Sequence, residues 1–374
     1  MMTQASIDIK KRPHVVFVES NTGYGNVRAC ALDMAKELDP REFTYLSYRG
    51  ETTQWALDHG LPVERMLMTP GANNSKVWDM LLHSAVSVHE SHDWWRGREA
   101  LMKRALLAGS HKIQLWHGST GPIGKEIGLG RLTAQPTFWH FAALAATSVS
   151  WDAMVHEPNA DEARRRQRVQ STSVIHDIEY RLVPVLEDGG WRKPMSPMII
   201  VAPTFPESVE GESTLVNWIS RLGLAAATHG WTVNVHLHPS TKSSVTKKLQ
   251  KVAGLNLMRN GVESFLLKSA SIVVTDYSSI AHDALVAGTP VAMAVEGLDS
   301  YKQNREILID QEQWDAVYIA KRPEELIPAI LDALERDTLA SARQAYRSSL
   351  LNSLGAKPGA NTKSAILAAL DAAR

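Results

Sequence analysis

The chain has 374 residues, with 40 basic and 40 acidic side chains and therefore no formal net charge. Its length is enough for about two domains of ordinary size. The balance of charge excludes a protein that coats nucleic acid through bulk electrostatics. Because Cys30 is the single cysteine, no intrachain disulfide can form, and we expect a reducing compartment.

The N-terminal segment lacks the apolar run after basic residues that a secretory signal requires, and no apolar stretch is long enough for a membrane-spanning helix. We therefore expect a cytoplasmic protein. Aromatic and apolar residues at 137–146 and the basic runs 10–12 and 164–168 would suit peripheral contact with the cytoplasmic face of the membrane. The alternative is a buried helix and two solvated charge runs.

The first half of the chain alternates apolar strands with helical patterns, which predicts α/β layers with parallel strands. The expected strands are 14–19, 43–48, 85–89 and 112–116. A helix should follow the loop at 20–26, because six residues recur there at helical spacing. These residues are Val27, Cys30, Ala31, Met34, Ala35 and Leu38.

A charged and proline-bearing stretch at 160–197 separates this half from a second series of strands and helices. The second series has expected strands at 198–202, 232–237, 272–275 and 290–295. We predict an α/β architecture of two doubly wound, Rossmann-like domains, residues 1–180 and 181–374. Their ligand should bind in a central cleft, at the carboxyl ends of the strands.

One junction between a strand and a helix in the second half has the features of a phosphate site. The strand 272–275 ends at Asp276, and a helix should begin at Ser278 or Ser279. A serine at this position has an ordinary structural role, since it accepts hydrogen bonds from the first N–H groups of the helix. Free N–H groups, the positive end of the helix and two hydroxyls would equally hold a phosphate. Spacing alone leaves both interpretations open.

A pair of histidines lies at the end of the strand 232–237. Alternation places His236 and His238 on one face, and Pro239 ends the strand. His238 could there donate to a phosphate or transfer a proton near neutral pH, or simply bond a backbone carbonyl. No metal-binding pattern accompanies the pair, so we expect no metal and no other cofactor.

The strand 112–116 leads into His117 and a glycine-rich loop that contains Gly118, Gly121 and Gly124. Glycines expose backbone N–H groups and permit close approach of an anion. The spacing does not fit the Walker pattern. His117 would supply a base from the first domain, while the second domain supplies the phosphate site.

Four segments together resemble motifs of the CDP-glycerol glycerophosphotransferase family, the teichoic-acid primases and polymerases with a GT-B fold. They are Gln114-Leu115-Trp116-His117-Gly118-Ser119, Ala202-Pro203-Thr204-Phe205, His238-Pro239 and Thr275-Asp276-Tyr277-Ser278-Ser279. Further similarities are Glu19-Ser20 with Gly25-Asn26, and Asp299, Tyr301 and Arg305 near the end. The resemblance implies that His117 is the general base. It also implies that His238 and Asp276 assist catalysis. The donor diphosphate would be held by Thr204, His238, Ser278, Ser279, Arg305 and Gly118.

The resemblance implies a phosphotransferase that moves glycerol phosphate, or another alditol phosphate, from a CDP-alditol to a hydroxyl and releases CMP. The acceptor would be a lipid-linked glycan or polyol phosphate, in the synthesis of a teichoic acid or capsule-like polymer of the cell envelope. The alternatives are a GT-B glycosyltransferase that uses a nucleotide sugar, and an inactive glycan- or nucleotide-binding assembly protein. Pro206 in place of a family arginine and the altered loop 119–125 bear on the alditol and the acceptor. So does the lack of a Gly-x-Pro-Arg element at 171–186.

Overall fold

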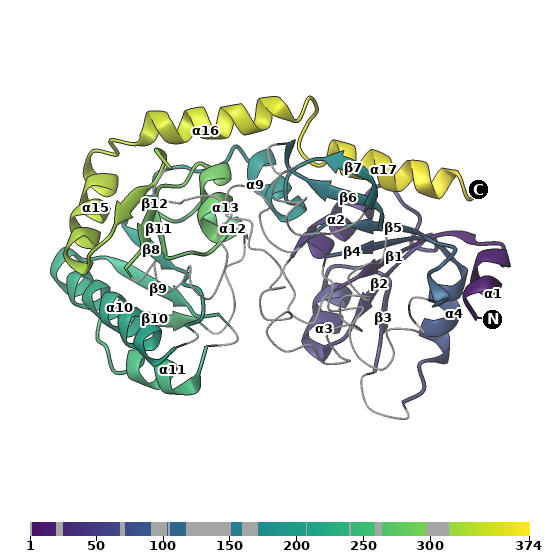
Figure 1. The fold of residues 1–374 in the computed structure, drawn as a ribbon, viewed down its shortest axis with the longest axis horizontal. Coiled ribbons are helices and arrows are strands. Elements are labelled where there is room, and N and C mark those ends of the chain that lie inside the picture. The colour runs from purple at the N-terminus through teal and green to yellow at the C-terminus, as the bar shows by residue number, and fades with distance from the viewer. Residues whose placement is uncertain are drawn as a thin grey trace, which may run out of the picture. The chain divides into compact units, whose positions relative to one another are not determined.

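The computed structural model describes most of the chain, and two compact units make it up (Figure 1). The described residues are 2–19, 25–67, 72–90, 103, 105–116, 151–158, 171–206, 208–238, 241–258, 264–296 and 314–374. Among them, the residues up to Val183 and those from Leu354 onward form the first unit. Pro184–Ser353 belong to the second.

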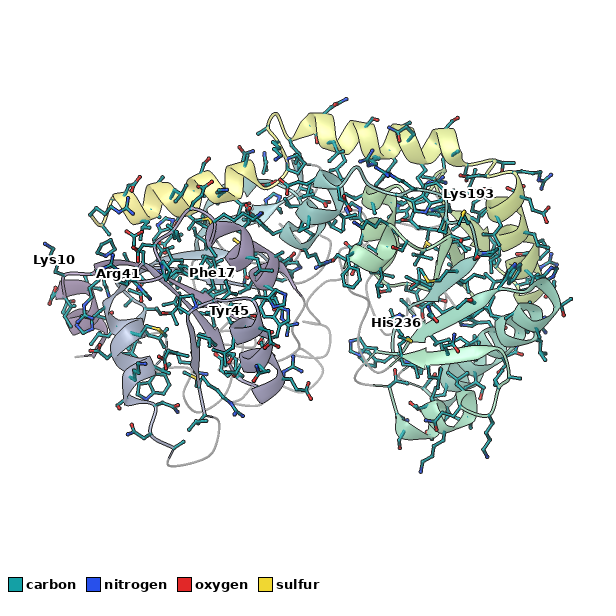
Figure 2. All side chains as sticks on the ribbon, turned by 180° about the vertical axis from the view of Figure 1, so that it is seen from behind. Lys10, Phe17, Arg41, Tyr45, Lys193 and His236 are labelled. Atoms are coloured by element: carbon teal, nitrogen blue, oxygen red, sulfur yellow. The ribbon has the colours of Figure 1, made fainter. Side chains whose placement is uncertain are left out.

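A seven-stranded parallel sheet in the order β3-β2-β1-β4-β5-β6-β7 is the centre of the first unit. Its strands are β1 (Arg12–Val18), β2 (Phe43–Ser47), β3 (Val63–Arg65), β4 (Ser84–His89), β5 (His111–Gln114), β6 (Trp151–His156) and β7 (Ser171–His176). The side chains of Phe17 and Tyr45 lie inside this unit (Figure 2). The strand order reverses between β1 and β4, which is the switch point where Rossmann-like sheets bind ligands.

Helices cover both faces of the first sheet. They are α1 (Met2–Asp8), α2 (Asn26–Met34), α3 (Gly50–Asp58), α4 (Ser75–His83), the short 3₁₀ helix η3 (Tyr180–Leu182) and α17 (Ala360–Asp371). The predicted apolar face of α2 is confirmed, because Val27, Cys30 and Met34 are buried. On α4, Val77 and Leu81 pack into an apolar cluster of the first unit.

The C-terminal helix α17 packs on β1, β4 and β7 of the first unit (Figure 1). The expected division after residue 180 places this helix in the second half. The buried Asp177, just after β7, accepts hydrogen bonds from Gly359 N at 2.8 Å and from Thr362 N and Oγ1 at 3.0 and 2.9 Å. These contacts hold the start of α17 on the first sheet, across a separation in the sequence that local patterns do not register.

A six-stranded parallel sheet in the order β10-β9-β8-β11-β12-β13 forms the second unit. Its strands are β8 (Met198–Val201), β9 (Thr232–His236), β10 (Leu255–Met258), β11 (Ile272–Thr275), β12 (Val291–Ala294) and β13 (Tyr318–Ala320). Its helices are α9 (Val183–Glu187), α10 (Val209–His229), α11 (Ser243–Leu249), α12 (Ser264–Leu267), α13 (Ile280–Ala287), α15 (Pro323–Glu335) and α16 (Ala340–Ser353). Apolar residues of α10, α11 and α15 form one core cluster with the sheet, while α13 contacts β11, β12 and α16.

All eight expected strands are confirmed, with shifts of a residue or two at their ends. Segment 171–176 lies within the stretch expected to separate the domains, but it forms β7 and pairs with β6. Its sequence is rich in serine and threonine, and most of its side chains are exposed, so it lacks the apolar pattern of a central strand. No helix in the described parts of the chain is both long and apolar enough to cross a membrane.

Candidate functional site

Asp276 links the segments that follow β8 and β11 in the second unit. Its Oδ1 accepts hydrogen bonds from Thr204 N at 2.8 Å and Tyr277 N at 2.6 Å, and its Oδ2 accepts one from Thr204 Oγ1 at 2.8 Å. Thr204 and Asp276 are 8% and 7% exposed. The carboxylate therefore orders two strand ends at the switch point of this sheet.

The start of α13 has the form of an anion site. Ser279 is its N-cap residue but makes no capping bond with its side chain, and both Ser278 and Ser279 are partly exposed. Over the described residues, neither backbone N–H of this pair has a protein acceptor. Ser278 Oγ lies 3.5 Å from Ile280 N, at the outer limit of a hydrogen bond. Hydroxyls and N–H groups at a helix start are thus available to a ligand.

The opposite end of α13 is fully bonded. Gly288 ends the helix in the left-handed conformation, with φ 93°. The carbonyl oxygens of residues 286, 287 and 288 accept hydrogen bonds from Arg347 Nε at 2.9 Å, Trp191 N at 2.8 Å and Arg343 Nε at 2.8 Å. Two guanidinium groups therefore satisfy the last carbonyls of the helix, and that of Arg343 is also paired with Asp337 at 3.0 and 2.6 Å.

His238 lies two residues beyond the end of β9, and its ring contacts the ring of Phe205 with a centroid distance of 4.7 Å. His236 is buried at the end of the same strand (Figure 2). Phe205 follows Thr204, which is bonded to Asp276. The ring contact with Phe205 and the bonds of Thr204 thus link His238, Thr204 and Asp276, while their role in holding a donor stays a prediction.

The other predicted site residues, His117, Gly118 and Arg305, lie outside the described residues. Trp116, which precedes His117, has a φ of 67°, a left-handed conformation that side chains other than glycine rarely adopt. Its N–H donates to Gln114 Oε1 at 3.2 Å, and its carbonyl accepts a hydrogen bond from Asn26 Nδ2 at 3.1 Å. Strained residues of this kind gather at functional sites.

The sequence analysis missed a set of buried carboxylates at the strand ends of the first unit. Glu19, after β1, bonds Arg28 at 2.8 and 2.6 Å. Glu90, after β4, accepts a hydrogen bond from Val27 N at 3.0 Å, in the first turn of α2. Glu179 bonds Asn26. An acidic residue directly after each expected strand was the available signal for Glu19 and Glu90.

One buried and one partly buried basic side chain in the first unit, His89 and Lys11, have lowered pKa values. Burial, with a smaller effect of Lys112, lowers the pKa of His89 to about 3. Burial and the nearby Lys112 lower the pKa of Lys11 to about 8, and its ammonium donates to Ser6 Oγ at 3.0 Å and Leu82 O at 2.6 Å. The ammonium of Lys11 is thus hydrogen-bonded inside the unit, and contact of the run 10–12 with anionic lipids stays a prediction. The segments 137–146 and 164–168 lie outside the described residues.

No cluster of three or more histidine, cysteine or acidic side chains within the described ranges could hold a metal ion. The polar groups at the start of α13 that face no protein acceptor among the described residues are hydroxyl and N–H donors. Such a set suits a diphosphate rather than a metal.

A comparison with known families gives a match over most of the second unit. Residues 189–355 match the family CDP-Glycerol:Poly(glycerophosphate) glycerophosphotransferase. The match confirms the resemblance predicted from the motifs and includes Thr204, His238, Asp276, Ser278 and Ser279. It supports a CDP-glycerol glycerophosphotransferase type of function. No curated protein matches the chain.

Solved structures show the same fold. A variant of the wall teichoic acid polymerase TagF soaked with CDPG has a TM-score of 0.67 at 15% identity, covering 99% of this chain and 92% of that one. A second TagF structure has a TM-score of 0.62, also at 15% identity, and covers 100% and 91%. UDP-glucose:anthocyanidin 3-O-glucosyltransferase in complex with UDP has a TM-score of 0.56 at 9% identity and covers 97% and 100%. The predicted α/β fold, similar to TagF and to GT-B glycosyltransferases, is confirmed.

Proposed function

We propose that the protein transfers glycerol phosphate from CDP-glycerol to a hydroxyl of a lipid-linked glycan or polyol-phosphate acceptor in teichoic-acid synthesis. The observation that carries this proposal is the start of α13, where Ser278 and Ser279 present hydroxyl and N–H groups within a segment that matches the glycerophosphotransferase family. The donor diphosphate would bind there, with His238 as a further donor of hydrogen bonds.

In the proposed step, the acceptor oxygen attacks the phosphorus that carries glycerol. A new phosphorus–oxygen bond forms as the bond to the CMP phosphate breaks, and CMP leaves with the electron pair. The proton of the acceptor hydroxyl passes to His117, whose neutral imidazole suits this task near neutral pH. Positioning and stabilisation of charge supply most of the rate enhancement in such a transfer.

Asp276 acts in this proposal as the group that fixes the donor site. Its three hydrogen bonds hold Thr204 and the backbone at Tyr277, one residue before the serines. The arginines at the other end of α13 strengthen the field at the serines, where the leaving CMP gains charge. Arg305 and Gly118 remain proposed as further donor-binding residues.

Ligand-dependent thermal unfolding tests the donor, with CDP-glycerol, CDP-ribitol, UDP-N-acetylglucosamine and CMP as ligands. A ligand at a hundred times its Kd adds about 2.7 kcal/mol to the free energy of unfolding, which is readily measured. We expect stabilisation by CMP and one CDP-alditol. Stabilisation by the UDP-sugar alone would instead favour the glycosyltransferase, whose fold this chain shares.

Transfer of radiolabelled glycerol phosphate to a lipid-linked acceptor tests the reaction itself. Replacing His117 with alanine should abolish transfer, while CMP should still stabilise the variant. His59→Ala is the matched control, because this exposed histidine bonds only its own helix in the described structure and should be dispensable. Full activity of His117→Ala would contradict the assigned base and favour an assembly protein without catalysis.

Lipid-linked acceptors require the protein to reach a membrane surface, and we propose peripheral contact with the cytoplasmic face through residues 137–146. Sedimentation with vesicles that contain anionic lipid should carry the protein down. Replacing Phe138 and Trp139 with serine should release it.

A further inference from the structure

We propose that Asn26 is a positioning residue: by holding the carbonyl of Trp116 it fixes the peptide group through which His117 joins the chain after β5. This inference rests on the proposed role of His117 as the base. The sequence analysis gave Asn26 only a similarity to the family and no role, and this inference gives it one.

All hydrogen-bonding groups of the Asn26 side chain are used. The side chain is fully buried at the first position of α2. Its Nδ2 donates to Trp116 O at 3.1 Å and to a carboxylate oxygen of Glu179, while its Oδ1 accepts a hydrogen bond from Arg181 N at 3.0 Å. An amide has two N–H donors and one oxygen acceptor, so this geometry fixes its orientation completely.

The neighbours of Asn26 decide on which side the nitrogen of the amide lies and on which side the oxygen lies. Glu179 accepts only, so it requires the nitrogen of the amide on its side. Arg181 N donates only, so it requires the oxygen on the other side. The remaining N–H is thus aimed at the carbonyl of Trp116, and the amide joins α2, the end of β5 and the segment after β7.

Trp116 is the residue that needs such support. Its φ of 67° is unfavourable for any residue with a Cβ, and it persists only where the surroundings impose it. Gln114 Oε1 holds its N–H at 3.2 Å and Asn26 holds its carbonyl, so the residue is bonded on both sides. Gln114 is also fully buried.

The carbonyl that Asn26 binds belongs to the same planar peptide group as the nitrogen of His117. Fixing this plane fixes the starting direction of the His117 backbone. A displacement of about 1 Å in a catalytic group lowers the rate about a hundredfold. Asn26 therefore acts on the chemical step through backbone geometry, without touching the donor site of the second unit.

Two substitutions test this role. Asn26→Asp keeps the shape but places a carboxylate oxygen against Trp116 O or Glu179, and Asn26→Ala removes the amide. We expect kcat to fall about a hundredfold in both, and the acidic limb of the pH profile of kcat/KM to shift. The KM for CDP-glycerol and the stabilisation by CMP should stay as in the wild type.

Asn74→Ala is the matched control. Asn74 is also buried in the first unit, and its amide bonds Leu67 N and Leu67 O, both at 2.9 Å, to fix a different loop. Its loss should lower the melting temperature as the loss of Asn26 does, with kcat and the pH profile unchanged. Equal kinetic effects at both positions would reduce Asn26 to a structural role and overturn the proposal.

Hydrogen exchange of the peptide 111–118 gives a readout that needs no activity. Exchange there should speed up in Asn26→Ala and remain as in the wild type in Asn74→Ala. If the wild type transfers no glycerol phosphate, the proposed function fails, while this exchange still decides whether Asn26 holds Trp116. Unchanged exchange and a kcat within about twofold of the wild type would overturn the inference.

Discussion

The two units share the order of strands around their switch points, yet they treat helix N-termini differently. In the first unit, the carboxylate of Glu90 accepts a hydrogen bond from Val27 N at the start of α2. In the second, Ser208 Oγ caps α10 by accepting from Gly211 N at 3.0 Å, and acidic residues lie in its first turn. The start of α13 lacks a capping bond from the side chain of Ser279, although the buried Asp283 lies in its first turn. The same strand order thus carries helix starts that the protein's own side chains satisfy, and one start, that of α13, which we propose as the site of a ligand.

The far end of α13 is bonded by another helix of its unit. Two arginines of α16 bond the last carbonyls of α13, although neither α13 nor α2 has a basic residue in its own last turn. Cations at the C-terminus leave the positive end of a helix uncompensated. The second unit is therefore organised electrostatically around α13, and the first around its buried carboxylates. Substitutions in each unit can test this difference between the two units.

The largest effect is expected at Asp276. Asp276→Ala leaves the buried N–H groups of Thr204 and Tyr277 without their acceptor, which should lower the free energy of unfolding by about 3–5 kcal/mol and abolish binding of CMP. Asp276→Asn retains one oxygen for both N–H groups and can donate to Thr204 Oγ1, so it should lose far less. Urea unfolding with and without CMP measures both. Equal losses would show that the carboxylate does not organise the site.

The lowered pKa of His89 predicts that the free energy of unfolding falls in acid. Its pKa is about 3 in the folded protein, mainly because it is buried, and near 6.5 in the unfolded chain. Between these values the unfolded chain binds one more proton, so the free energy of unfolding falls as the pH falls. The slope is about 1.4 kcal/mol per pH unit, or about 2–3 kcal/mol from pH 6 to pH 4.

Unfolding in urea at several pH values checks this prediction. His89→Phe should lose that part of the dependence, since phenylalanine does not titrate and can still pack on Trp151. The exposed His59→Phe serves as control and should retain the full slope. Identical slopes for His89→Phe and the wild type would place the acid sensitivity elsewhere.

Substitutions of Ser278 and Ser279 should have the opposite effects on binding and stability from a substitution of a serine that caps a helix. Ser278→Ala and Ser279→Ala should each weaken binding of CMP about tenfold, or about 1.4 kcal/mol, with the free energy of unfolding nearly unchanged. Ser208→Ala in α10 should cost about 1 kcal/mol of stability and leave binding of CMP intact. Calorimetric titration and urea unfolding separate the two. A loss of stability at α13 without a loss of affinity would make its serines ordinary caps.

Much of the fold could be predicted because short apolar strands bounded by turn residues are local signals. The strand Ile272–Thr275 and the end of α13 at Gly288 agree with the predicted positions. The polar strand β7 and the three-residue β13 lack that signal. Placement of α17 depends on Asp177, which lies 182 residues before Gly359, so no local pattern reveals it.

The candidate site was predictable as a set of residue types, but its connections were not. Asp276 and Thr204 are 72 residues apart, and they meet because β8 and β11 are neighbours in the sheet. The role of Asn26 depends on contacts with residues 90 and 153 positions away. Which of these distant residues meet depends on the order of the strands in the sheet, and the periodicity of the sequence does not reveal that order.

The smallest predicted effect concerns the charge at the start of α2. Glu90→Gln keeps an oxygen for Val27 N but removes the negative charge, so it should cost only about 0.5–1 kcal/mol of stability. The difference from the wild type should shrink in high salt, because screening weakens the interaction of a charge with the helix dipole. Urea unfolding at low and high salt measures it. Because the site is already filled by a carboxylate in the wild type, CMP should stabilise both proteins equally; preferential stabilisation of Glu90→Gln would instead reveal a second anion site in the first unit.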